Sequence, residues 1–207
     1  MIHYNAAHIW GTIHDIENKE TENNKKPYLE VQVNCPSSKY GNIRAFCRVW
    51  GEQRVNSILK HFSVGDRINA RGMVSQYVGR HKVIKTNFTI FDIFFWNPAE
   101  DKHKDARSAF ILSGECDAFE AATGDTPGRL SIRVVRTDED ETKVLSDETF
   151  VVEFPKHMAI DLGGEPAVGS TYRVKGSLQQ EEDEFGELTV PSRPVVMGIQ
   201  EVKESAG

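Results

Sequence analysis

One pattern occurs twice in this chain and restricts its fold more than any other feature of the sequence. Val64-Gly65-Asp66-Arg67-Ile68-Asn69-Ala70-Arg71-Gly72-Met73-Val74 recurs 104 residues later as Val168-Gly169-Ser170-Thr171-Tyr172-Arg173-Val174-Lys175-Gly176-Ser177-Leu178. Each copy has a Val-Gly turn, then the alternating apolar and polar residues of a strand, and then a glycine where the strand must bend. Shorter landmarks recur at similar offsets, Ile9-Trp10-Gly11 as Leu112-Ser113-Gly114 and Tyr28-Leu29-Glu30-Val31 as Arg129-Leu130-Ser131-Ile132. The sequence therefore predicts a duplicated β-domain.

The length of the chain fits this duplication. Its 207 residues suffice for two domains of about 100 residues, each able to bury a core. Between the copies, the segment from Asn97 to Asp105 is polar and contains Pro98, so it is interpreted as a linker. We expect an N-terminal domain over 1–97, a linker over 98–107 and a C-terminal domain over 108–207.

Hydrophobic periodicity suggests the elements of the first copy. It predicts strands at about 7–16, 28–35, 43–50, 66–77 and 83–96, and one short helix over 53–61. The all-polar segment from Glu17 to Pro27 is expected to be a long mobile loop. Five strands with a helix between the third and fourth is the order of an OB-fold. The expected fold class is all-β, with two tandem OB-fold-like five-stranded barrels that each have at most one short helix.

The third strand separates two kinds of side chain. Because successive residues of a strand point to opposite faces, Ile43, Ala45, Cys47 and Val49 share one face and Arg44, Phe46, Arg48 and Trp50 share the other. The first set suits a barrel core. The second places two guanidinium groups and two large rings on the outer face, a mixture that suits single-stranded nucleic acid, because bases stack on rings and Arg holds phosphates or stacks on bases. Alternatively, Phe46 and Trp50 pack under a neighbouring loop or subunit.

Other candidate nucleic-acid-binding residues surround this strand. The fourth strand adds Arg67, Arg71 and a terminal Tyr77 to the same face, where Asn69 and Ser75 also fall. The hairpin after it carries Arg80, His81, Lys82 and Lys85, and the loop before strand three carries Lys39 and Tyr40. Solvated charged loops are the alternative interpretation of the loop residues. Trp10, on the first strand, suits a lid over the core as well as a stacking platform.

The fifth strand ends in an unusually apolar run. Ile90-Phe91-Asp92-Ile93-Phe94-Phe95-Trp96 is too apolar for one exposed strand end, so we expect it to pack against the second domain or a second subunit.

The net charge of -6 hides an asymmetry between the two copies. Residues 1–104 hold 15 Lys and Arg against 10 Asp and Glu, whereas residues 105–207 hold 10 against 21. The first half, at +5, suits a phosphate-bearing partner. The second half, at -11, carries acidic loops at 138–141 and 181–184 and its strand over 149–154 does not combine cations with rings, so we expect it not to bind DNA strongly.

The segment Phe46-Cys47-Arg48-Val49-Trp50-Gly51-Glu52, followed by a helix and the first copy of the repeat, resembles bacterial-type single-stranded DNA-binding proteins. In that family a strand ending in an aromatic-glycine pair leads through a helix to a Gly-x-x-hydrophobic-x-hydrophobic-x-Gly strand. The resemblance covers about residues 7–96 and implies an OB-fold, no catalysis and sequence-tolerant binding. The chain ends without the family's acidic tail and terminal Phe, and the second copy has Phe154-Pro155 in place of the aromatic-glycine pair. These departures suggest a divergent member, of a phage or plasmid type.

Several other functions find no support in the sequence. The seven histidines are dispersed and no phosphate-binding, nucleophile-elbow or dinucleotide motif occurs, so we expect no enzyme, no cofactor and no metal site. Cys35, Cys47 and Cys116 have no C-x-x-C spacing and are expected to be buried apolar residues. No apolar run approaches the roughly 18 residues of a membrane span. The first residues do not form a signal peptide, so a cytoplasmic location is expected.

These observations together favour a non-catalytic protein that coats single-stranded DNA in replication, recombination or repair. Its C-terminal domain would serve oligomerisation, with a homodimer expected, or recruit replication and recombination proteins. Two alternatives remain open at this stage. One is an OB-fold replisome or primosome adaptor in which the acidic domain is the working surface, and the other is an RNA-binding OB protein.

Overall fold

The structure is a computed structural model that describes residues 3–21, 25–37, 41–78, 84–97, 99, 107–138, 143–179 and 193–202. The chain divides into two compact units. The N-terminal unit consists of Ala7–Ala109 and Leu178–Ser192, and the C-terminal unit of Met1–Ala6, Phe110–Ser177 and Arg193–Gly207.

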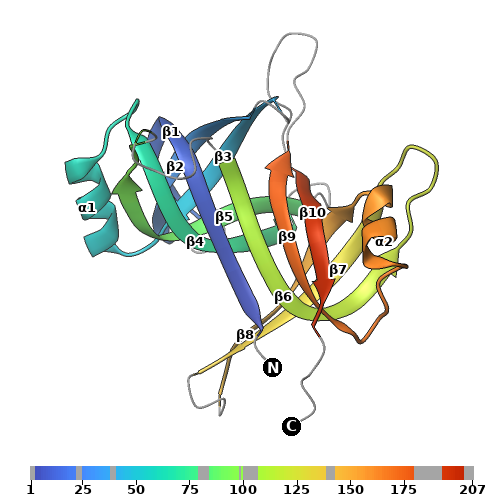
Figure 1. Cartoon of the computed structure of the whole chain (residues 1–207). Coiled ribbons are helices and arrows are strands. Elements are labelled where there is room, and N and C mark those ends of the chain that lie inside the picture. The colour runs from blue at the N-terminus through green and yellow to red at the C-terminus, as the bar shows by residue number, and fades with distance from the viewer. Residues whose placement is uncertain are drawn as a thin grey trace. The chain divides into compact units, whose positions relative to one another are not determined.

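The described residues form ten strands and two short helices (Figure 1). The elements are β1 (Tyr4–Glu20), β2 (Pro27–Ser37), β3 (Gly41–Val49), α1 (Glu52–His61), β4 (Arg67–Val78), β5 (Ile84–Phe95), β6 (Arg107–Glu120), β7 (Gly128–Thr137), β8 (Val144–Phe154), α2 (Lys156–Leu162), β9 (Thr171–Gln179) and β10 (Arg193–Glu201).

Both units have the same closed sheet topology. In the N-terminal unit the strand order is β2-β3-β5-β4-β1, and a further pairing between β2 and β1 closes the barrel. In the C-terminal unit the order is β6-β7-β8-β10-β9, closed by the pairing of β6 with β9. Each barrel contains one parallel pair, β3 with β5 and β8 with β10. This topology confirms the expected fold class of two five-stranded OB-like barrels with one short helix each.

The first strand of each barrel pairs with two neighbours because it bends. Residues Ala7 to Thr12 of β1 pair with β4, and Thr12 to Glu20 pair with β2. A register shift lies just beyond this change of partner, between Ile13 and Asp15, and β6 has the equivalent shift between Cys116 and Ala118. A bulge of this kind increases local bending and lets one strand close a barrel.

Glycine is required where these strands change partner. A Cβ at Gly11 would collide with the backbone carbonyl of Asn34 in β2, and a Cβ at Gly114 with that of Arg133 in β7. The recurrence of these two glycines in the sequence therefore follows from close strand contact.

The repeated Val-Gly turn has the same hydrogen bonds in both copies. Gly65 and Gly169 have φ of 95° and 86°, in the region that favours glycine. The Gly65 amide donates to the Ile13 carbonyl at 2.9 Å, and the Gly169 amide donates to the Cys116 carbonyl at 2.9 Å. The duplication predicted from the sequence is therefore present in the backbone hydrogen bonds.

The two barrel cores follow the alternating patterns. In the N-terminal unit the buried residues include Ile9, Ile13, Leu29, Val31, Val33, Ile43, Ile68 and Phe88; in the C-terminal unit they include Phe110, Leu112, Leu130, Ile132 and Phe150. Cys35, Cys47 and Cys116 are buried free thiols, as expected, and burial raises the pKa of each.

The expectation of a long loop from Glu17 to Pro27 was wrong. The polar residues Glu17 to Glu20 belong to β1, and Glu20 pairs with Pro27 at the start of β2. Polar side chains on both faces are compatible with a strand end outside the core, which periodicity alone does not separate from a loop.

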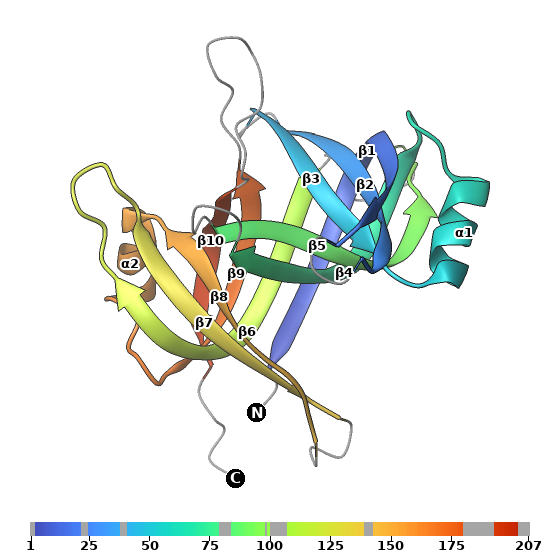
Figure 2. The same ribbon diagram turned by 180° about the vertical axis from the view of Figure 1, so that it is seen from behind.

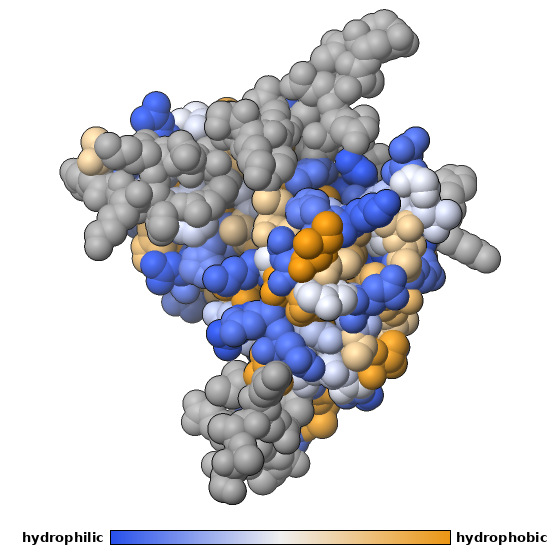
Figure 3. Space-filling model, turned by 45° about the vertical axis from the view of Figure 1, so that its right-hand side comes forward, coloured by the Kyte–Doolittle hydropathy of each residue, from blue (hydrophilic) through white to orange (hydrophobic). Residues whose placement is uncertain are grey.

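Apolar residues also reach the surface in places. In the space-filling view, orange residues on the visible face are scattered among blue hydrophilic ones (Figure 3). Within the described residues, no helix is long and apolar enough to cross a membrane.

Candidate nucleic-acid interface

The outer face of β3 has the composition that the alternation predicted. Ile43, Ala45, Cys47 and Val49 are all buried in the barrel. Their neighbours Arg44, Phe46, Arg48 and Trp50 are all partly exposed. Two cations and two rings therefore lie on the outer side of the sheet, as expected for this strand.

Arg48 lies between two tyrosine rings from different strands. Its guanidinium carbon is 5.0 Å from the ring centroid of Tyr28, on β2, and 4.8 Å from that of Tyr77, on β4. The strand order places these rings on opposite sides of β3. Such contacts hold an arginine side chain in place without using its N–H donors.

A second set of contacts continues from Tyr28 toward the end of β3. The rings of Tyr28 and Trp50 are 5.0 Å apart and tilted by 38°. The Lys26 ammonium lies over the Trp50 ring at 5.1 Å. These contacts form one row of two cations and three rings, called here the cation–ring row, in the order Lys26, Trp50, Tyr28, Arg48 and Tyr77.

Gly51 follows Trp50 in the two-residue connection between β3 and α1. Its φ is 93° and its ψ is 128°, a conformation that L-residues with side chains rarely adopt. A Cβ there would meet nothing within 4 Å, so the backbone conformation, and not lack of space, requires glycine. The aromatic-glycine pair thereby presents a ring at the strand end and lets α1 begin at once.

A buried carboxylate beside the row is neutralised by a lysine. Glu30 lies opposite Arg48 on β2 and is mostly buried. The Lys19 ammonium is 2.5 Å from Glu30 and 2.9 Å from Glu17. Burial alone would lower the pKa of Lys19, but hydrogen bonds to Glu30 and Glu17 raise it, so Lys19 is a cation at neutral pH. Arg48 therefore remains available to an anionic ligand.

The remaining predicted residues fall into four groups, of which Arg67 and Arg71 are the last. Arg44, whose Nε donates to Asn34 Oδ1 at 3.3 Å, and Phe46 share the face of the row. Lys85 pairs with Tyr77 across the β4–β5 ladder and is exposed. The predicted Lys39, Tyr40, Arg80 and Lys82 lie outside the described residues.

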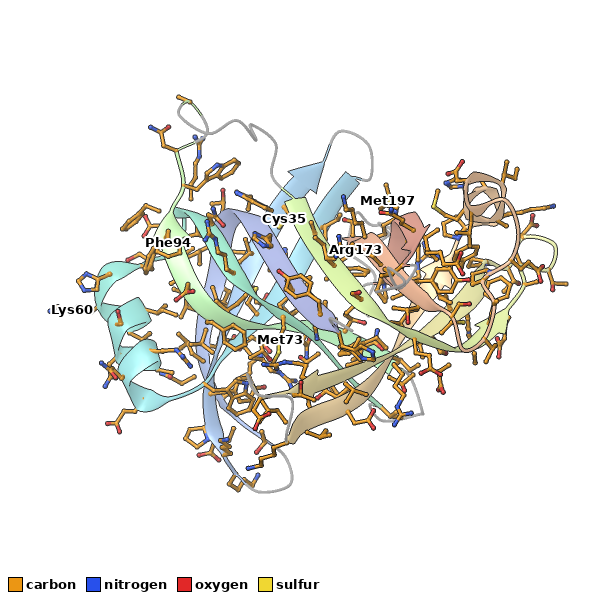
Figure 4. All side chains as sticks on the ribbon, turned by 60° about the horizontal axis from the view of Figure 1, so that its bottom comes forward. Cys35, Lys60, Met73, Phe94, Arg173 and Met197 are labelled. Carbon is orange, nitrogen blue, oxygen red and sulfur yellow. The ribbon has the colours of Figure 1, made fainter. Side chains whose placement is uncertain are left out.

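Arg67 and Arg71 do not join the row. Both are exposed on β4, but Arg71 is six residues from Tyr77, which corresponds to about 20 Å along a strand. Arg71 lies opposite Asp92 and over the Phe94 ring at 5.8 Å. Phe94, labelled in Figure 4, belongs to the part of β5 near α1, where Phe95 and Phe62 stack at 4.6 Å.

The apolar end of β5 divides between core and surface. Ile90 and Trp96 are buried, whereas Phe91, Phe94 and Phe95 are exposed. Its packing against a second domain or subunit stays a prediction. Trp10 is 9 % exposed and stacks on His8 at 5.4 Å, which favours the interpretation as a lid over the core.

Sequence reasoning missed Tyr28 and Lys26. Tyr28 immediately precedes Leu29, Val31, Val33 and Cys35, which alternate into the core, so the same period of two would have placed it on the opposite face. There its ring is only 8 % exposed, with Arg48 and Trp50 against it. For Lys26 no periodicity was available, because its place over Trp50 depends on the pairing of β2 with β3.

The C-terminal unit presents a different outer face. On β7 and β8, Arg133 makes two hydrogen bonds to Asp147, at 2.8 Å and 2.6 Å. Arg193, on β10, lies 3.2 Å from Glu153. The outer residues of β8 are Thr149, Val151 and Glu153, and none has an aromatic ring. These two arginines are paired with carboxylates.

No metal site is found in the part of the chain that the structure describes, because no group of three or more His, Cys, Asp and Glu side chains gathers there.

Solved structures share this architecture. The wild-type single-stranded DNA binding protein from Thermus aquaticus matches with a TM-score of 0.63 at 12% identity, over 100% of this chain and 97% of that chain. A deletion mutant of the same Thermus aquaticus protein matches with a TM-score of 0.61 at 14% identity, over 99% and 97%. No model of a known protein family matches the sequence, and no curated protein does. At these identities the structural matches show a common fold of two OB barrels.

Proposed function

We propose that this chain binds single-stranded DNA without catalysis, through the outer face of its N-terminal barrel. The observation that carries this proposal is the cation–ring row, which runs over β2, β3 and β4 beside Arg44 and Phe46. Rings stack with any base at about 1–3 kcal/mol each, and neighbouring cations hold the phosphates between those bases. A surface of this kind binds single strands with little sequence specificity.

The comparisons support the proposal. The two solved structures that share the fold are named single-stranded DNA binding proteins. A duplex binder needs an element shaped for a groove, whereas a flat sheet face with rings accepts unpaired bases.

The two halves of the chain have different roles in this proposal. The binding domain is the N-terminal one, over 1–97, and the acidic C-terminal one, over 108–207, serves dimer formation or the recruitment of replication and recombination proteins. The role in replication, recombination and repair, the homodimer and the cytoplasmic location rest on sequence reasoning alone.

Tryptophan fluorescence tests the proposal directly. Of the tryptophans, Trp10 and Trp96 are both 9 % exposed, whereas Trp50 is the more accessible. Oligo-dT should therefore quench the fluorescence of Trp50, and binding should weaken as salt is raised from 50 to 200 mM. A Trp50→Phe variant is the control, since it keeps a ring on the face but removes the signal, so its binding is followed by anisotropy of a labelled oligonucleotide.

The same titration separates the alternative functions. An adaptor whose acidic domain is the working surface would show no salt-sensitive binding of oligo-dT, and this result would overturn the proposal. Stronger competition by oligo-rU than by oligo-dU would instead indicate an RNA-binding protein, because these two competitors differ only in the 2′-hydroxyl.

A further inference from the structure

An open groove lies beside the end of the cation–ring row, in the N-terminal unit. It has a volume of about 680 Å³, and its walls come from the end of β1, the start of β2 and the first turn of α1. A ligand site of this size holds a small organic molecule or one nucleotide. Both ribbon views show α1 outside the strands of its barrel, next to this end of β2 (Figures 1 and 2).

Local hydrogen bonds hold the walls of the groove. The Thr21 amide donates to the Lys26 carbonyl at 3.0 Å, and the Lys26 amide donates to Thr21 Oγ1 at 2.9 Å. These bonds extend the β1–β2 ladder beyond Glu20 and Pro27. On the opposite wall, Gly51 directs the chain into α1, where the Val55 amide donates to the Gly51 carbonyl at 3.0 Å. The groove is therefore formed by regular structure.

The groove combines apolar surface with carboxylates. Tyr28, Pro27 and Val55 supply the apolar lining. Glu20 and Glu52 also line it, both exposed, and within the described part of the chain neither has an ion-pair partner. Lys19 does not neutralise them, because it is held by Glu17 and Glu30.

The side chains that line the groove favour the base of a nucleotide over its phosphate. Two carboxylates repel a phosphate, so the phosphate of a bound nucleotide belongs near Lys26, which lies over Trp50 at the mouth of the groove. A base suits the interior, because its faces are apolar and its edge is polar. A carboxylate accepts a hydrogen bond from an exocyclic amine, as Glu and Asp do with N4 of cytosine. Thymine and uracil carry no such amine.

We propose that this groove holds one base with an exocyclic amino group, such as cytosine, from the strand bound along the cation–ring row. Glu20 and Glu52 accept hydrogen bonds from the amine and determine the preference, while Tyr28 and Val55 pack against the ring. The inference rests on the proposed function and adds to it a base preference at one position of an otherwise sequence-tolerant site.

The test compares three labelled homo-oligonucleotides of equal length, oligo-dC, oligo-dU and oligo-dT, on the full chain. Cytosine has an amine at C4 and an acceptor nitrogen at N3, where uracil has a carbonyl oxygen and an N–H, and uracil and thymine differ only in a methyl group. We expect oligo-dC to bind about threefold to tenfold more tightly than oligo-dU, as one additional base contact would give. Oligo-dT should bind like oligo-dU.

Variants assign the preference to the groove. The double change Glu20→Ala and Glu52→Ala should reduce the dC to dU affinity ratio to about 1 without weakening oligo-dU binding. Glu120→Ala is the matched control, because it removes an exposed carboxylate from the corresponding end of β6, outside the groove, and should keep the ratio. Val55→Phe should also abolish the preference by narrowing the groove, whereas Leu59→Phe, on the same helix away from the groove, should preserve it.

The possible failures are distinguishable. Equal and tight binding of all three oligonucleotides by the unaltered chain would overturn the base preference and leave the proposed function standing. A dC preference that survives in the double alanine variant would likewise overturn it, because the preference would then arise from stacking on the row. Failure to bind any of the three would overturn the proposed function itself.

Discussion

The two barrels share one backbone plan but present opposite chemistry on equivalent outer faces. In the N-terminal barrel Arg48 contacts the rings of Tyr28 and Tyr77. In the C-terminal barrel Arg133 is held by the two oxygens of Asp147. A guanidinium over rings keeps its charge available to a ligand, whereas a carboxylate cancels it. An OB barrel therefore does not bind nucleic acid by virtue of its fold alone. The residues on the outer side of its strands determine whether it does.

The two barrels also differ in the arginine–glutamate pairs that face each other across neighbouring strands. Glu30 faces Arg48 across β2 and β3, whereas Arg129 faces Glu153 across β7 and β8. In the first pair the carboxylate is held by Lys19, outside the pair. In the second, Glu153 also receives Arg193. The carboxylate is thus held by a lysine outside the pair in the N-terminal barrel and by a second arginine in the C-terminal barrel.

Charge reversal should separate the two faces most strongly. Arg48→Glu removes the central cation of the row and adds a carboxylate beside Glu30, so oligo-dT affinity should fall by about 100-fold or more. The matched variant Arg133→Glu, on the outer face of the C-terminal barrel, should change affinity by less than about twofold, as expected for an exposed charge outside the site. Equal losses, measured by anisotropy, would mean that both barrels bind the strand.

Removal of a ring should have a somewhat smaller effect. Trp50→Ala and Phe46→Ala should each weaken oligo-dT binding by about 1–3 kcal/mol, because one base loses its stacking partner in each case. Val151→Ala, on the outer face of β8, is the control and should leave binding unchanged. Wild-type affinity in a folded Trp50→Ala protein would exclude the row as a stacking surface.

The salt dependence of binding tests how many cations contact phosphates of the bound strand. If Lys26, Arg44, Arg48 and Lys85 contact phosphates, log affinity should fall with log salt at a slope of about -3, from about -0.7 for each phosphate. Arg48→Ala should reduce the magnitude of the slope by about 0.7. Arg48→Lys should retain the slope but bind more weakly, because lysine does not reproduce the planar contacts with two rings. An unchanged slope in the alanine variant would show that Arg48 does not contact phosphate.

The smallest expected effect concerns the ion pair of the C-terminal face. The hydrogen bonds from Arg133 lower the pKa of Asp147 in the folded state. The stability that the pair contributes is therefore present above the ordinary Asp pKa and is lost as the pH falls through the lowered value. Asp147→Asn should slightly lower the urea midpoint at pH 7, and the difference should disappear in acid.

High salt should also reduce this difference, because both side chains are exposed. Glu148→Gln is the control, since it removes the next carboxylate along β8. A difference between Asp147→Asn and the unaltered chain that persists at low pH would show that the stabilisation does not depend on the carboxylate's charge.

Much of the fold could be derived from the sequence because barrel strands encode their faces locally. A period of two assigns Cys47 to the core and Arg48 to the outside without knowledge of any partner strand. The Val-Gly turns at Gly65 and Gly169 likewise require a backbone conformation that the residue type itself favours. The ends of strands were harder to predict from the sequence. Glu17 to Glu20 belong to β1, but no buried residue among them marks the segment as a strand.

Residue spacing was enough to predict the duplication, the core and the outer position of Phe46, Arg48 and Trp50, because each depends on the pattern along the chain. The contacts of Tyr28 and Tyr77 with Arg48, and of Lys26 with Trp50, could be seen only in the folded chain. Those contacts join residues from different strands, and their geometry depends on register, twist and barrel closure. Local periodicity carries no information about register between strands, because that register is set by the packing of the whole barrel.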